Sequence, residues 1–228
     1  MTELLLVGGS GLAREVLNVL RISGDSRTIG VLDDLPELRG TSIDGAPVLG
    51  ALDEVAHHPD AQVVLCVGQG SARARIAERL AEFGVTDARF ARVVHPRVEV
   101  PENCQIGAGS IVLAGAVFTA DVVLGRHVVV MPHVTLTHDD RVESFATLCA
   151  GVTLGGNVRI GAGAYLGMNA SVRQRVTVGR YGTLGMGAVL LEDLPDSETW
   201  AGVPARHLCT APDDAHSPVA SVFSGGIL

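Results

Sequence analysis

The chain has 228 residues, with 17 positive against 25 negative side chains and a net charge of −8 when histidines are neutral. This acidic balance argues against a nucleic-acid-binding protein, which normally carries a basic face. All 17 positive residues are arginine, so Schiff-base chemistry and a Walker-type phosphate loop, which both need a lysine amine, are excluded.

The first residues carry no basic segment, and no apolar stretch reaches about 18 residues, so neither a signal peptide nor a membrane span is expected. The four cysteines are scattered, without a CxxC pair, at Cys66, Cys104, Cys149 and Cys209. Reduced structural thiols are the simplest interpretation of this pattern. We expect a cytoplasmic protein.

Residues 1–94 alternate between short apolar runs and segments with helical spacing. The runs at 3–8, 28–32 and 62–67 predict strands, and the segments 12–20 and 72–83 predict helices packed on a sheet. This order predicts a small Rossmann-like α/β domain with a parallel sheet, which binds ligands at the carboxyl ends of its strands.

A glycine turn follows the first predicted strand, with the sequence Gly-Gly-Ser-Gly at 8–11. Such a turn lets a phosphate approach the backbone at a helix amino terminus. Asp33 follows Gly11 by 22 residues, near the place of an acidic residue that binds a ribose. Because GxGxxG is incomplete, three readings stay open here: a nucleotide or nucleotide-sugar site, a structural tight turn, and an intact NAD site.

From about residue 95 an apolar residue recurs every six positions. The sixteen rungs of this ladder are Val100, Ile106, Val112, Phe118, Leu124, Val130, Leu136, Val142, Leu148, Leu154, Ile160, Leu166, Val172, Val178, Leu184 and Leu190. A fixed period indicates a solenoid, and three hexads make one triangular coil. Residues 95–208 are therefore expected to form a left-handed parallel β-helix of five coils with a C-terminal cap.

A second inward position lies four residues after each rung from Ile106 to Leu184 and is small or β-branched at every site except Asp140. We interpret Asp140 as a local break in the prism. The ends of a β-helix must be covered, because their strand edges are unpaired. Residues 1–95 are expected to cover one end and Trp200–Arg206 the other, and 209–228 to form a disordered tail.

His138 lies two residues after the rung Leu136, at a position that should project outward. Imidazole is a suitable general base, and the adjacent Asp139 could orient it through a hydrogen bond. One coil of 18 residues later comes Gly156, whose backbone N–H could bind an oxyanion. The competing reading is an inert surface histidine beside turn-forming aspartates.

The hexads, His138-Asp139, and the stretches 157–161, 166–169 and 202–206 resemble the hexapeptide-repeat sugar acyltransferases. The glycine turn, Asp33-Asp34 and Gly68 resemble the subgroup that acts on nucleotide-linked amino sugars, which includes bacillosamine and perosamine N-acetyltransferases and sialic acid O-acetyltransferase relatives. The resemblance covers residues 3–208.

The resemblance implies a homotrimer with acetyl-CoA, or another acyl-CoA, in the cleft between prisms and no metal. It assigns His138 as the base, Asp139 as its orienting acid and the Gly156 N–H as the oxyanion donor. The acyl-CoA would also meet Thr147, Met168 and Met186. The amino-terminal domain would hold the nucleotide sugar with Gly8, Ser10, Gly11, Asp33, Asp34 and Gly68.

Met168 and Met186 are again one coil apart. They could line a flexible pantetheine arm or pack against a neighbouring subunit, because methionine suits both environments. The nearby Arg173, Arg175 and Arg180 could meet the phosphates of coenzyme A or remain solvated.

Three positions depart from the family: Leu12, Met131 and Thr147 stand where relatives carry histidine, asparagine and histidine. These replacements leave open the sugar, the acyl chain, and whether nitrogen or oxygen is acylated.

Two alternatives belong to other functional classes. His133 and His138 have the spacing of two zinc ligands of a γ-type carbonic anhydrase, but the third position would be Arg97, with His95 two residues away. The other alternative is an inactive homologue that only binds a nucleotide sugar.

Overall fold

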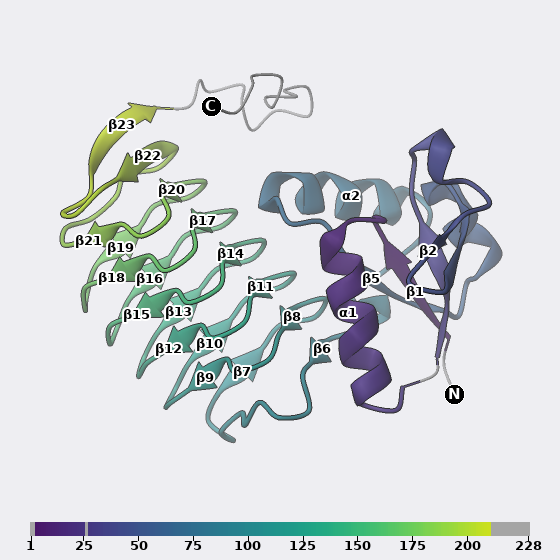
Figure 1. Cartoon of the computed structure of the whole chain (residues 1–228), viewed down its shortest axis with the longest axis horizontal. Helices are drawn as coiled ribbons and strands as arrows, with labels where there is room; N and C mark the ends of the chain where they lie inside the picture. The colour runs from purple at the N-terminus through teal and green to yellow at the C-terminus, as the bar shows by residue number, and fades with distance from the viewer. Residues whose placement is uncertain (1–2, 26, 211–228) are drawn as a thin grey trace.

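The computed structural model describes residues 3–25 and 27–210 and comprises an α/β domain followed by a left-handed parallel β-helix (Figure 1). The α/β domain contains β1 Leu4–Val7, α1 Gly11–Ile22, β2 Thr28–Leu32, η1 Pro36–Leu38, β3 Ser42–Ile43, β4 Ala46–Gly50, η2 Leu52–His57, β5 Gln62–Leu65, α2 Gly70–Glu82 and η3 Asp87–Arg89. The three predicted strands and both predicted helices are therefore confirmed.

The sheet of this domain has the order β3-β4-β2-β1-β5 and is parallel except for the β3–β4 hairpin. All four residues of β1 are buried, as their uninterrupted apolar sequence predicts for a central strand covered on both faces. Ser10 caps α1, because its hydroxyl accepts a hydrogen bond from the Leu12 N–H. The glycine turn thus lies at the carboxyl end of the central strand.

The β-helix begins with β6 Val93–Val94 and ends with β22 Glu198–Ala201 and β23 Arg206–Thr210. Between them lie strands of two residues: β7 Gln105–Ile106, β8 Ile111–Val112, β9 Val117–Phe118, β10 Val123–Leu124, β11 Val129–Val130, β12 Thr135–Leu136, β13 Arg141–Val142, β14 Thr147–Leu148, β15 Thr153–Leu154, β16 Arg159–Ile160, β17 Tyr165–Leu166, β18 Ser171–Val172, β19 Thr177–Val178, β20 Thr183–Leu184 and β21 Val189–Leu190. Each of these strands ends in a predicted rung.

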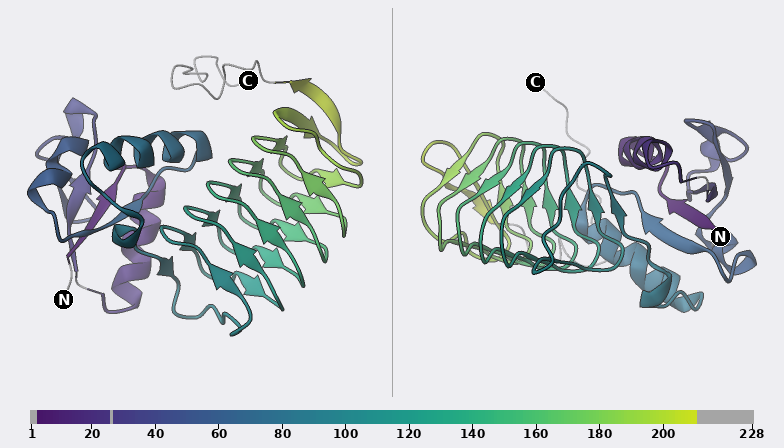
Figure 2. Two further views of the ribbon diagram at one scale, coloured as in Figure 1. Left: turned by 180° about the vertical axis from the view of Figure 1, so that it is seen from behind. Right: turned by 90° about the horizontal axis from the view of Figure 1, so that it is seen from below.

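The strands stack into three parallel sheets, and the registers pair residues 18 apart, as the coil arithmetic predicts. The stacked coils are seen from two further sides in Figure 2. We call the sheet of β6, β8, β11, β14, β17, β20, β22 and β23 the domain-facing sheet, because it lies toward the α/β domain. The rungs from Val112 to Leu190 are buried in one continuous core.

The prediction that Val100 is the first rung is wrong, because Val100 belongs to no strand and 36% of its surface is exposed. In the regular coils the residue after a rung donates its N–H to the rung one coil later, as in Thr119 N to Leu136 O (3.2 Å). Pro101 follows Val100 and has no N–H to donate. The regular coils therefore start at β7.

Every sixth residue from 109 to 187, three positions after a rung, has a positive φ. Glycine, asparagine and aspartate are common at these corners, because they tolerate the left-handed conformation. Asp139 (φ 64°) and Asn157 (φ 59°) occupy two consecutive coils of this column. The corner geometry therefore fixes the backbone beside His138.

Asp140 does not break the prism, contrary to the sequence interpretation. The side chain is fully buried at the expected inward position, and strands form on both sides of it. Its two carboxylate oxygens accept hydrogen bonds from Thr137 N (2.8 Å) and Val158 N (2.9 Å). A buried carboxylate with both oxygens bonded to backbone N–H groups can replace an apolar residue there.

Contrary to the prediction that residues 1–95 cover one end of the prism, the α/β domain packs against a side of it. Its α1 residues share a core with Ile111, Leu113 and Val129. The first coil is covered instead by Val94, Val98 and Cys104 from the connecting segment. Side packing leaves the carboxyl ends of the α/β sheet beside the β-helix, where domain contacts can form.

At the other end Trp200 packs against the last coil, which confirms the predicted cap. The strands β22 and β23 form a hairpin that extends the domain-facing sheet. Residues 211–228 of the predicted tail lie outside the described residues, whereas 209 and 210 belong to β23.

His127 is buried where the two domains meet, between the rings of Phe90 (4.4 Å, edge-on) and Phe145 (5.0 Å, stacked). Neither of its ring nitrogens has a hydrogen-bond partner among the described residues. Burial lowers its pKa to about 3, and the nearby Arg126 and Arg73 act in the same direction. The histidine is therefore neutral in the folded protein.

The neutral His127 predicts an acid-sensitive domain junction. His127 is protonated below pH 6.5 in the unfolded chain but only below about pH 3 in the folded chain. The free energy of unfolding therefore decreases as the pH falls through that window. Between pH 7 and pH 5 the loss is about 2 kcal/mol. Urea unfolding at the two pH values should show a smaller loss in His127→Phe, and equal losses in both proteins would contradict this assignment.

Candidate active site

His138 stands at the corner between β12 and β13, which is the corner opposite the domain-facing sheet (Figure 1). Two hydrogen bonds hold this corner. The buried Asp140 carboxylate accepts from Thr137 N (2.8 Å), and the Thr137 hydroxyl donates to Leu154 O of the next coil (3.1 Å). Burial raises the pKa of Asp140 to about 6, against its backbone hydrogen bonds. The histidine thus projects from a rigid turn, as predicted.

The His138 ring is paired with Asp139, since Nδ1 lies 2.8 Å from the carboxylate Oδ2. Both side chains are exposed, at 67% and 57%. A proton on Nδ1 is donated to Asp139 in this arrangement, which leaves the Nε2 lone pair free to accept another. The pair has the geometry of an oriented base.

Gly156 lies directly against the same ring. A Cβ atom built on Gly156 would be 2.3 Å from His138 Nε2, so a side chain cannot be added without moving the ring. The coil arithmetic had predicted this neighbour. Absence of a side chain therefore keeps the backbone at 156 close to His138 Nε2.

Backbone N–H groups at this corner position can bind oxygen. Equivalent groups donate to side chains elsewhere in the coil: Arg126 N to Ser144 Oγ (3.1 Å), Ala162 N to Glu143 Oε2 (3.0 Å) and Arg180 N to Asp196 Oδ1 (2.7 Å). Among the hydrogen bonds of residues 3–25 and 27–210, the Gly156 N–H has no acceptor. It is available to a ligand oxygen.

An open pocket of about 480 Å³ surrounds this corner, lined by His138, Asp139, Gly156, Asn157, Gln174 and Arg175. Neither Asn157 nor Gln174 was predicted to be a site residue. Adding one further coil to Gly156 would have found Gln174.

If His138 is the general base that the sequence predicts, replacing Asp139 with asparagine should lower kcat on the order of 10- to 100-fold, because the imidazolium formed on proton transfer would lose its carboxylate partner. Asparagine tolerates the positive φ of this corner, so the fold should not change. Asp121→Asn is a matched control, since Asp121 occupies the same corner one coil earlier (φ 56°). Equal kinetics for the two variants would remove Asp139 from the mechanism.

The predicted substrate residues of the α/β domain do gather at the carboxyl ends of its strands. Ser10 Oγ donates to Cys66 O (2.7 Å), while Gly9 N donates to Asp33 Oδ2 (2.6 Å). Gly8 has a φ of 97°, and a Cβ there would be 2.7 Å from Val67 Cγ2. The glycine turn is thus closely packed against the end of β5.

Asp34 and Gly68 also have partners within the chain. Asp34 accepts from Arg79 Nη1 (2.6 Å) and Leu52 N (3.0 Å), and the hydrogen bond with Arg79 lowers the pKa of Asp34. The carbonyl of Gly68 accepts from the Thr147 hydroxyl (2.8 Å).

Thr147 is not brought to His138. It lies on the domain-facing sheet, is buried at 3% exposure and bonds to the α/β domain. Met168 and Met186 are exposed, at 49% and 71%, on the corner before β18 and β21. One chain therefore holds its α/β domain and His138 on opposite sides of the prism.

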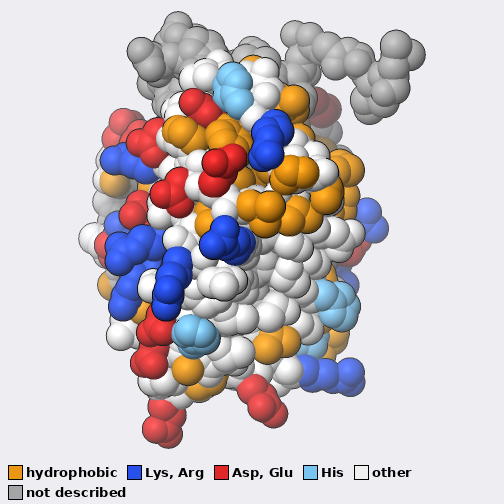
Figure 3. All heavy atoms as spheres, turned by 90° about the vertical axis from the view of Figure 1, so that its left-hand side faces the viewer, with side chains coloured by type: hydrophobic (Ala, Val, Ile, Leu, Met, Phe, Trp, Pro, Cys, Tyr) orange, Lys and Arg blue, Asp and Glu red, His pale blue; other side chains and the backbone are white. Residues whose placement is uncertain are grey.

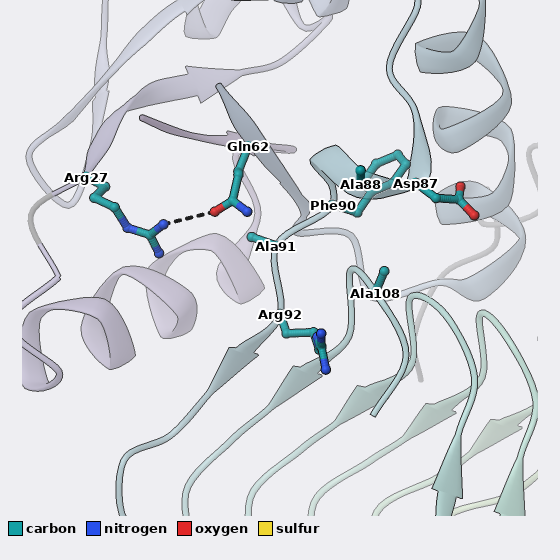
Figure 4. Close-up of a pocket in the computed structure, with 8 residues that line it drawn as sticks. All are labelled: Arg27, Gln62, Asp87, Ala88, Phe90, Ala91, Arg92 and Ala108. Atoms are coloured by element: carbon teal, nitrogen blue, oxygen red, sulfur yellow. Dashed lines mark hydrogen bonds between the residues drawn. The ribbon is translucent and has the colours of Figure 1, made fainter. Parts of the chain in front are cut away.

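A second pocket, of about 370 Å³, lies where the domains meet and includes Arg27, Gln62 and Arg92 (Figure 4). Arg27 is already engaged, because it donates to Gln62 Oε1 (2.9 Å) and to the Asp25 carboxylate (2.7 Å).

Within the described part of the chain, no group of three or more His, Cys, Asp or Glu side chains is placed to hold a metal ion. The zinc alternative therefore has no complete ligand set among these described residues. None of the described helices is long and apolar enough to cross a membrane.

Comparisons with known proteins identify the family. The family described as PglD N-terminal domain matches residues 3–80. The acetyltransferase domain of PglB from Neisseria gonorrhoeae FA1090 is 31% identical, and the match covers 91% of this chain and 100% of that one with a TM-score of 0.82. The chain belongs to the hexapeptide sugar acetyltransferase family.

Two other relatives support membership of this hexapeptide family. A histidine variant of perosamine N-acetyltransferase from Caulobacter crescentus, solved with CoA and GDP-perosamine, is 26% identical (TM-score 0.84, covering 92% of this chain and 98% of that one). UDP-N-acetylbacillosamine N-acetyltransferase from Bacillus subtilis is 29% identical over 116 residues, which cover 50% of this chain and 52% of that protein. As a family member, the chain is an acyltransferase.

Proposed function

We propose that the chain transfers an acyl group, most directly acetyl, from acyl-CoA to the amino group of a nucleotide-linked amino-deoxy sugar in the cytoplasm. The observation that carries this proposal is the His138–Asp139 pair, with Gly156 against the ring, in an open pocket. The arrangement offers a base and an oxyanion donor at one point, which direct acyl transfer requires.

In the proposed mechanism, the sugar amine attacks the thioester carbonyl while His138 Nε2 takes its proton. The Gly156 N–H donates to the oxyanion of the tetrahedral intermediate. The carbon–sulfur bond then breaks, and the imidazolium returns the proton to the thiolate, so coenzyme A leaves as a thiol. Asp139 stabilises the imidazolium, and no covalent enzyme intermediate is needed.

The α/β domain is the proposed binding site of the nucleotide sugar, through Gly8, Ser10, Gly11, Asp33, Asp34 and Gly68. These residues lie within the match to the PglD N-terminal domain, and a relative has been solved with GDP-perosamine. The acyl-CoA is proposed to run past the exposed Met168 and Met186, because methionine suits a flexible pantetheine arm. Binding of acyl-CoA itself is supported by the related PglB domain, which has been solved with acetyl coenzyme A.

We also propose that the protein acts as a homotrimer. The α/β domain and His138 face opposite sides of one prism, so a second copy is needed to bring the sugar to the base. Hydrophobic side chains gather on the C-terminal coils (Figure 3), where Met168, Met186 and Leu191 are exposed. Such surfaces on a soluble protein are typical of subunit interfaces.

A panel of acceptors separates amine from hydroxyl acylation. The protein is incubated with acetyl-CoA and matched nucleotide sugars that differ only in an amino or a hydroxyl group, and thiol release is measured. Faster release with the amino sugars supports the proposal, whereas a preference for the hydroxyl sugars would favour an O-acetyltransferase. Binding of the sugars without thiol release would indicate an inactive homologue.

A further inference from the structure

Arg73, in α2, is fully buried and joins the two domains. Its guanidinium donates to two carbonyls of the loop after β5, Val67 O and Gly68 O (both 2.8 Å). The remaining donors go to the β-helix: His127 O (3.0 Å), Phe145 O (2.7 Å), Ala146 O (3.0 Å) and Thr147 Oγ1 (3.0 Å). One side chain thus bonds six acceptors in two domains.

The guanidinium has no carboxylate partner among the ion pairs of the described residues. Burial lowers its pKa to about 9, so the side chain remains charged at neutral pH. Burying an unpaired charge is costly unless every donor is satisfied. A methionine or leucine could fill the same space without the desolvation cost of a buried charge. The buried guanidinium therefore points to a role in fixing the positions of the carbonyl groups that it binds.

The carbonyl of Gly68 is the point where this network meets the proposed sugar site. It accepts one hydrogen bond from Arg73 and a second from the Thr147 hydroxyl (2.8 Å). Two residues further, a Cβ on Gly70 would be 2.1 Å from Phe145 O, so α2 begins in direct contact with the coil. The loop 67–70 is therefore held against the β-helix from both of its ends.

We propose that Arg73, together with Thr147, is a positioning residue that locks the loop 67–70 onto the β-helix and so fixes the sugar-binding wall relative to the coils. This inference rests on the proposed function for the identity of the ligand. Fixing the loop to the coils matters, because the same coils carry the proposed catalytic corner at His138. Loss of the lock should weaken acceptor binding and leave acyl-CoA binding unchanged.

The test uses the full-length Arg73→Lys variant, which keeps the charge and loses the planar fork. Thr147→Val is a milder second variant that removes one donor to Gly68 O and decides the matter if Arg73→Lys does not fold. Arg89→Lys is the matched control, because Arg89 also bonds two carbonyls, Ala61 O (2.9 Å) and His58 O (2.8 Å), but both within the α/β domain.

Arg73→Lys should raise the KM for the nucleotide amino sugar about tenfold or more, the change expected when hydrogen bonds of a charged group are lost. The KM for acyl-CoA should stay the same, and Arg89→Lys should change neither value. Folded Arg73→Lys or Thr147→Val with an unchanged acceptor KM, or with both KM values raised equally, would overturn the proposal.

Hydrogen exchange gives a readout that does not depend on the substrate. The amides of residues 67–70 should exchange faster in Arg73→Lys and Thr147→Val, while those of the coils β15–β20 should not change. If exchange increases but no nucleotide sugar is acylated, the proposed function fails and the lock stands. Unchanged exchange in both variants would overturn the lock itself.

Discussion

His138→Asn should lower kcat by about 10²- to 10⁴-fold, because the proposed mechanism loses the general base that takes the amine proton. Stability should be almost unaffected, since the ring is 67% exposed and its hydrogen bond is made to an exposed aspartate. Steady-state release of coenzyme A, measured at saturating acyl-CoA, checks the expected loss.

His133→Asn is the matched control for this variant. His133 also lies at a corner of the prism, against Gly115, but at the corner between β11 and β12. Its replacement should leave the pH profile of kcat unchanged. Activity of His138→Asn within about threefold of the unmodified protein would exclude general-base catalysis by His138.

Gly156→Ala should reduce kcat by about 100-fold, because the added Cβ, 2.3 Å from Nε2, forces the His138 ring out of place. The fold should tolerate the change, since Ala120 and Ala162 occupy equivalent corner positions. Thermal unfolding and kcat of the purified variant are the measurements.

The double variant His138→Asn/Gly156→Ala separates this mechanism from a general disturbance of the pocket. If glycine serves mainly to seat the histidine, the double variant should be no slower than His138→Asn alone. Fully additive losses would assign Gly156 an effect independent of the ring, and a normal kcat in Gly156→Ala would contradict the assignment.

The β-helix could be predicted from sequence because its structure repeats the same local interactions every six and every 18 residues. Once the coil length was known, counting from His138 reached Gly156, and the structure confirms that contact. Val100 shows the limit of periodicity: its side chain fits the ladder, but Pro101 lacks the N–H that the next coil needs. The spacing of apolar residues alone does not reveal that this hydrogen bond is missing.

The domain junction could not be predicted, because it follows no period. Arg73 has the appearance of an ordinary helical surface arginine in the sequence, and only the docked coils supply the carbonyls that surround it. The family resemblance placed Thr147 beside the acyl-CoA, whereas in the structure its hydroxyl donates a hydrogen bond to Gly68 O of the α/β domain. Asp140 was interpreted as a break, although the coil provides two N–H groups for its carboxylate.

The most direct test of the central claim is identification of the product by mass spectrometry and NMR after incubation with acetyl-CoA and a nucleotide-linked amino sugar. The proposed mechanism predicts one amide-linked acetyl group per coenzyme A thiol released, and almost no product with His138→Asn. Absence of any acylated sugar across a broad panel of amino sugars, or a fully active His138→Asn variant, would contradict it.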